Sequence, residues 1–131
     1  MAVVGTESTS LKCAHGLSAV SAINAGTVIA IPAKAGVQFI ISGGWMRSTG
    51  SADTATSVDW TDGTTVACAF TVGGLTDGAI SRAGTAVTAI GTNVGTPLAV
   101  NKPVKVKSTG GNVGTATYIE WCITYHETRI T

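Results

Sequence analysis

The sequence predicts an all-β protein: a jelly-roll-like β-sandwich preceded by an N-terminal arm. Only 11% of the 131 residues are charged, and 17 are glycine. Thr, Ser and Val are abundant, whereas Leu, Glu and Lys, which commonly fill helical faces, are scarce. Short β-rich runs separated by Gly-rich turns, without convincing crossover helices, favour a sandwich over an α/β fold.

Residues 1–24 are predicted to form the arm, and residues 25–131 the sandwich domain. Apolar residues recur in the arm at about every third position between small polar ones, a spacing that is also compatible with a short helix. We expect the arm to be dispensable for folding and to become ordered on a neighbouring molecule. Its expected contact residues are Leu11, Leu17, Val20 and Ile23.

The first strands of the domain are marked by residues that end or bend a strand. Residues 27–31 form a β-rich run that stops at Pro32, which cannot donate to a sheet ladder. Residues 37–42 resume the extended pattern, and Gly43-Gly44 permits a bulge or bend. The sequence therefore predicts two strands here, the second of which continues past an irregularity.

A β-hairpin is predicted in the middle of the chain. Asp62-Gly63 is a strong turn signal, and it lies between the β-rich residues 55–60 and 65–72. Residues 85–90 are a further short strand candidate. About eight strands are expected in all.

The last strand, residues 115–125, is the clearest element of the sequence. Its apolar residues alternate with polar ones, as expected for a strand with one buried face. We expect Ile119, Trp121 and Ile123 to form a central part of the core.

Charge and motif content argue against several classes of function. The net charge is +1, so no basic field exists to attract nucleic acid or an anionic membrane, and no apolar run approaches the roughly 20 residues of a membrane span. His15 and His126 lack the spacing of a metal site, and no nucleophile or phosphate-binding motif is present. We expect no enzymatic activity and no cofactor.

The three cysteines and three tryptophans have ordinary structural interpretations. Cys13, Cys68 and Cys122 lack zinc-site spacing, and we expect reduced thiols; a disulfide from Cys122 to another chain is the main alternative. Trp45, Trp60 and Trp121 are expected in a core or interface, although a sugar-stacking platform stays open. Because so little charge protects the surface, we expect a homo-oligomer, most simply a trimer.

The C-terminal part of the chain resembles a known group of proteins. Residues 102–107 (Lys-Pro-Val-Lys-Val-Lys) lead through Ser-Thr-Gly-Gly into a long strand that ends in Tyr-His-Glu at residues 125–127, and residues 29–33 read Ile-Ala-Ile-Pro-Ala. This layout resembles small virion proteins of tailed phages, such as head decoration proteins and fibre components.

The resemblance implies a trimeric sandwich on the exterior of the virion, assembled in the bacterial host cytoplasm. Such a protein would bind the major capsid protein and stabilise the phage head as a decoration or cement protein, and its N-terminal arm would reach the next subunit. The alternative is a fibre-tip or lectin-like adhesin that binds a host surface glycan.

Overall fold

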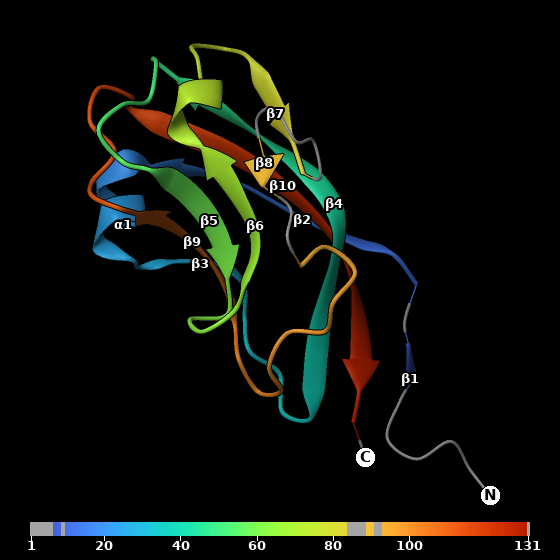
Figure 1. Cartoon of the computed structure of the whole chain (residues 1–131). Coiled ribbons are helices and arrows are strands. Elements are labelled where there is room, and N and C mark those ends of the chain that lie inside the picture. The colour runs from blue at the N-terminus through green and yellow to red at the C-terminus, as the bar shows by residue number, and fades with distance from the viewer. Residues whose placement is uncertain (1–6, 9, 84–88, 91–92, 131) are drawn as a thin grey trace, which may run out of the picture.

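The structure is a computed structural model that describes residues 7–8, 10–83, 89–90 and 93–130. Within these residues, ten strands form two sheets packed face to face, and all the pairings between named strands are antiparallel (Figure 1). The predicted all-β sandwich is confirmed. Its core lies between the two sheets, as expected when each sheet buries one face.

Sheet A has β10 and β4 at its centre. β10 pairs on one side with β4 and on the other with β2 and then β1, while β7 pairs with the outer side of β4. The strands of sheet A are β1 (Glu7–Ser8), β2 (Lys12–Ala19), β4 (Val37–Thr49), β7 (Ile80–Arg82) and β10 (Tyr118–Arg129).

Sheet B has the order β3-β9-β5-β6-β8 and covers the inner face of sheet A. Its central strand, β5, is buried along its whole length. The strands of sheet B are β3 (Val28–Ile31), β5 (Ser57–Thr61), β6 (Val66–Thr71), β8 (Ala89–Ile90) and β9 (Val104–Thr109).

Two short helical segments connect the sheets. Helix α1 (Val20–Ala25) carries the chain from β2 in sheet A to β3 in sheet B, and it ends at Gly26, whose φ of 71° is the left-handed conformation that glycine adopts readily. The 3-10 helix η1 (Val72–Gly74) follows β6.

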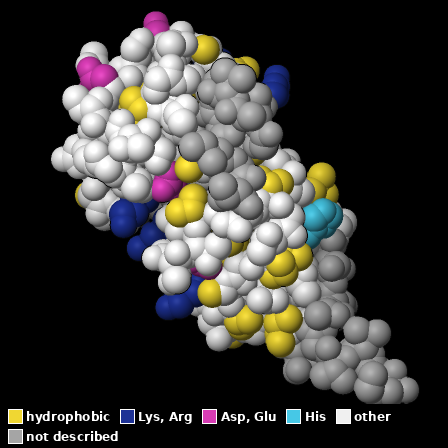
Figure 2. Space-filling view, in the orientation of Figure 1, with side chains coloured by type: hydrophobic (Ala, Val, Ile, Leu, Met, Phe, Trp, Pro, Cys, Tyr) yellow, Lys and Arg dark blue, Asp and Glu magenta, His cyan; other side chains and the backbone are white. Residues whose placement is uncertain are grey.

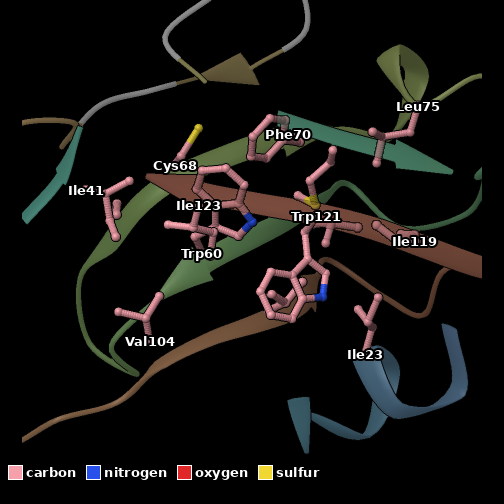
Figure 3. Close-up of a cluster of buried hydrophobic side chains, with 14 of the residues drawn as sticks. Ile23, Ile41, Trp60, Cys68, Phe70, Leu75, Val104, Ile119, Trp121 and Ile123 are labelled. Atoms are coloured by element: carbon pink, nitrogen blue, oxygen red, sulfur yellow. The ribbon is translucent and has the colours of Figure 1, made fainter. Parts of the chain in front are cut away.

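Aromatic and branched side chains from both sheets fill the core (Figure 3). Trp60 of β5 packs against Phe70 of β6, with ring centroids 4.7 Å apart. From the opposite sheet, β10 contributes the three residues that the sequence places in the core: Ile119, Trp121 and Ile123 are all buried.

Residues 12–24 require a correction, because they belong to the sandwich and not to a separate arm. β2 pairs with β10 over eight residues, and Val20 and Ile23 of α1 are buried in the core, with exposed fractions of 6% and 0%. Only Leu11 and Leu17 of the four expected contact residues are exposed. Residues 1–6 and 9 lie outside the described residues.

The pattern of β2 explains why the strand was missed. Its more exposed positions hold Cys13, His15 and Leu17, and its inward positions include Gly16 and Ser18. Most of the side chains that face the core are therefore small. Gly16 is required there, because a Cβ atom at this position would lie 2.3 Å from the indole of Trp121. The sequence of β2 lacks the usual strand pattern because its partner β10 supplies the bulky side chain, Trp121.

The other local predictions agree with the structure at most points. β3 ends at Ile31 before Pro32, and β4 continues through Gly43 and Gly44 with a register shift against β10. β5 and β6 form the predicted hairpin. Of the candidate strand at residues 85–90, residues 89–90 form β8, and residues 85–88 lie outside the described part.

Candidate functional site

The outer face of sheet A, the side turned away from sheet B, brings chemically distinctive side chains together. Strand register aligns them in rows across β2, β10, β4 and β7. One row runs Leu17, Glu120, Arg47, Ile80, and the next runs His15, Cys122, Trp45, Arg82. We call this surface the A face.

Glu120 is the electrostatic centre of the A face. Its Oε2 lies 2.8 Å from Nε2 of His15, and its Oε1 accepts a hydrogen bond of 2.5 Å from Nη2 of Arg47. The hydrogen bond from His15, followed by that from Arg47, lowers the pKa of the Glu120 carboxyl below its ordinary value. Glu120 is therefore ionised at neutral pH, which suits it to hold its neighbours in place and not to donate a proton.

Cys122, His15 and Glu120 form a thiol, imidazole and carboxylate group, a combination that also occurs in nucleophilic catalysis. Here the thiol is not activated. Burial, followed by the hydrogen bond with Cys13, raises the pKa of the Cys122 thiol to about 11. A nucleophilic cysteine needs a lowered pKa, so this arrangement does not favour covalent catalysis.

Exposed apolar side chains flank the ionic centre. Leu17 is 64% exposed and Ile80 is 47% exposed, at opposite ends of the same row. Tyr118 on β10 and Leu11, which directly precedes β2, are also exposed. Figure 2 shows a different side of the molecule, with sheet B in front: most of that surface is uncharged, and several Lys and Arg side chains lie along one edge. The A face thus combines apolar edges with one ordered ion pair, a composition that suits contact with another protein.

The three tryptophans divide between the core and the A face. Trp60 is fully buried and Trp121 is 6% exposed, so neither indole is available to a ligand. Trp45 is half-buried on the A face, where its ring centroid lies 6.0 Å from that of His15. The sequence does not distinguish the three tryptophans, and of the three only Trp45 is placed to meet a partner.

A second charged cluster closes one end of the sandwich. The buried carboxylate of Glu127 on β10 lies 2.6 Å from Nζ of Lys34, in the β3–β4 connection, and 3.3 Å from Nζ of Lys12 on β2. The hydrogen bond from Lys34, with further support from Lys12, lowers the pKa of Glu127 despite partial desolvation. The cluster ties β2 and the β3–β4 connection to β10.

We expect this cluster to make stability depend on pH. The pKa of Glu127 is lower in the folded protein than the ordinary glutamate value of 4.5. The ionised carboxylate therefore contributes fully to the free energy of unfolding above pH 4.5, and this contribution is lost as the pH falls through the pKa of the folded protein. Glu127→Gln should lower the free energy of unfolding at pH 7 by about 1 kcal/mol, a small effect because both lysines are partly exposed. The difference should disappear in acid. Urea denaturation at pH 7 and pH 3 measures it, and equal stability of both proteins at pH 7 would contradict it.

Metal binding and membrane crossing each require particular features of the described part of the chain. Within it, no three or more His, Cys, Asp or Glu side chains are grouped so that they could hold a metal ion. Among the same residues, no helix has the length and apolar character needed to cross a membrane.

Comparison with protein-family models, with curated proteins and with solved structures finds no match for this chain.

Proposed function

We propose that this protein is a non-enzymatic structural component of a virus particle: a jelly-roll capsid decoration protein of a tailed phage that acts as an oligomer, most simply a trimer. It binds the major capsid protein on the outside of the head and stabilises contacts between capsid subunits. It catalyses no reaction, because the free energy of its binding to the capsid subunits is what opposes opening of the shell.

The observation that carries the proposal is the nesting of strand pairs. β5 pairs with β6, β4 with β7, β3 with β9, and β2 with β10, so that each pair encloses the previous one in the sequence. Successive pairs lie alternately in sheet B and sheet A. This nesting supports the jelly-roll proposal, because a jelly roll is a long hairpin rolled up so that its strand pairs alternate between two sheets; β1 and β8 would be additions to it.

Jelly rolls occur in viral capsid proteins and in lectins, so the fold narrows the functional classes without selecting one. The A face supports the structural role. Its exposed Leu17 and Tyr118 lie beside the Glu120–Arg47 ion pair, and Tyr and Arg are residue types enriched at protein interfaces. The low overall charge also favours association over repulsion between copies.

Two measurements test the proposal directly. Light scattering of the purified protein should give the mass of a trimer, and sedimentation with shells of the major capsid protein should carry the protein into the pellet. Leu17→Asp should weaken capsid binding or self-association about 10- to 100-fold, because burial of a leucine contributes about 1.5–3 kcal/mol.

A matched control distinguishes an interface from general damage. Ile29 on β3 is 53% exposed, comparable to the 64% of Leu17 on β2, but it belongs to sheet B. Ile29→Asp should leave both assembly and capsid binding intact. A protein that is monomeric and does not sediment with shells, or an equal loss in both variants, would overturn the proposal.

A second candidate function, a glycan-binding adhesin, is favoured by one observation. Trp45 lies beside His15 and one row from Arg47 and Glu120, so an aromatic ring and charged hydrogen-bonding groups share one surface. Sugar sites commonly combine these groups. Glycan-array binding that is lost in Trp45→Ala would support the adhesin, whereas capsid binding without any glycan signal would exclude it.

A further inference from the structure

The A face also carries a pair of thiols in contact with each other. Cys13 lies on β2 and Cys122 on β10, 109 positions apart in the sequence. The register pairs Cys13 with Thr124 and His15 with Cys122, so the two cysteines are diagonal neighbours on the same face of the sheet. Their Sγ atoms are 2.8 Å apart.

We propose that Cys13 and Cys122 are a disulfide site: on exposure to a small-molecule disulfide such as oxidised glutathione, they form an intramolecular bond that locks β2 onto β10. The inference concerns the fold of one chain and does not rest on the proposed function. It replaces the alternative, considered from sequence, in which Cys122 bonds to another chain.

The geometry requires little movement. A disulfide bond is about 2.05 Å long, so the sulfur atoms need to approach by less than about 1 Å. The eight paired residues of β2 and β10 fix the two backbones on either side of the thiols. Oxidation therefore joins atoms that the sheet already holds together, and an intramolecular partner is available at far higher effective concentration than a second molecule.

The difference in exposure gives the order of the two steps. Cys13 is exposed and Cys122 is half-buried, so the thiolate of Cys13 attacks one sulfur of oxidised glutathione and releases one glutathione thiolate. Cys122 loses its proton and displaces the second glutathione from the mixed disulfide. Two protein S–H bonds and one glutathione S–S bond are replaced by one protein S–S bond and two glutathione thiols, and two electrons pass to glutathione.

The surroundings of Cys122 predict that the second step is the slower one. Burial is the largest cause of the raised pKa of its thiol and persists after Cys13 has formed the mixed disulfide, so little thiolate is present at neutral pH. The pair should stay reduced in a reducing cytosol and oxidise in an oxidising medium. Formation of the bond fixes β2, which covers one edge of the core beside Trp121.

The test uses the full-length protein incubated with oxidised glutathione, and a matched sample kept in excess reductant. After removal of the oxidant, denaturation and alkylation, the reduced sample should show three reactive thiols and the oxidised sample one. The oxidised protein should remain a single chain on a non-reducing gel, and digestion should yield one linked peptide pair that contains Cys13 and Cys122. Its melting temperature should rise by about 5–15 °C, because the bond closes a long loop in the unfolded chain.

Two variants make the assignment specific. Cys13→Ser removes an exposed thiol, so it should fold and should show no intramolecular bond and no rise in melting temperature. Cys68→Ala changes a buried cysteine of β6 and should retain both effects. Three reactive thiols after oxidation, a stable mixed disulfide with glutathione, or a covalent dimer would each overturn the proposal. The peptide map of the oxidised protein without substitutions decides between these outcomes even if the Cys68 variant does not fold.

Discussion

Replacement of Trp121 by alanine should destabilise the protein by about 3–5 kcal/mol and leave most of it insoluble. The indole is 6% exposed and lies over Gly16 of β2, where it fills the space that a side chain would otherwise take. Its Nε1 donates a hydrogen bond of 3.0 Å to Oγ of Ser18. Loss of the ring would therefore leave a cavity between β10 and β2 as well as an unpaired hydroxyl.

Urea denaturation of two further variants separates these contributions. Trp121→Phe keeps most of the apolar volume but loses the hydrogen bond to Ser18, and it should be less harmful than Trp121→Ala. Trp45→Ala removes a half-buried ring from the A face and should also have the smaller effect. If Trp121→Ala melts within a few degrees of the parent, the ring does not hold β2 in place.

Local signals in the sequence predict the strands whose ends and buried faces are set by a few neighbouring residues. Pro32 ends a strand because it lacks an amide donor, and Asp62-Gly63 forms a tight turn because glycine adopts positive φ, here 100° at Gly63. The alternation in β10 was equally readable, because one of its faces packs on the core. These features depend on a few neighbouring residues, and so they can be inferred without knowledge of the partner strands.

β2 could not be predicted in the same way. Its inward positions are small because Trp121, more than one hundred residues later, occupies the space above Gly16. An alternation of exposed Cys, His and Leu with Ala, Gly and Ser has the reverse of the usual polarity, and by itself it resembles spaced apolar anchors on an arm. The pattern makes sense only once β10 is placed beside it.

The A face could not be predicted from the sequence for the same reason: its residues come together only when the strands pair. His15 and Arg47 meet Glu120 from 105 and 73 positions away, through the register of three strands. No motif spacing links residues so distant, and in sequence each is an isolated polar residue. The sequence did contain one usable signal, because Cys13, His15 and Leu17 stand two apart and would share a face if the segment were a strand.

Deletion of residues 1–24 should abolish folding, which reverses the expectation for a dispensable arm. The deletion removes β2 and most of α1, including the buried Val20 and Ile23, each of which contributes about 1.5–3 kcal/mol through burial. It also uncovers Trp121 and breaks the ladder along one side of β10. Together these losses equal much of the 5–15 kcal/mol by which a typical domain is stable.

Deletion of residues 1–10 provides the matched control, since it keeps β2, α1 and their contacts with β10. The shorter deletion should give soluble protein with a cooperative urea transition, and the longer one should give aggregated or unfolded protein by circular dichroism. A folded 25–131 fragment with the midpoint of the parent would mean that β2 adds nothing to the core, and the description as an arm would be restored. If both truncated proteins fold and only the longer deletion loses capsid binding, β2 serves attachment and not the sandwich.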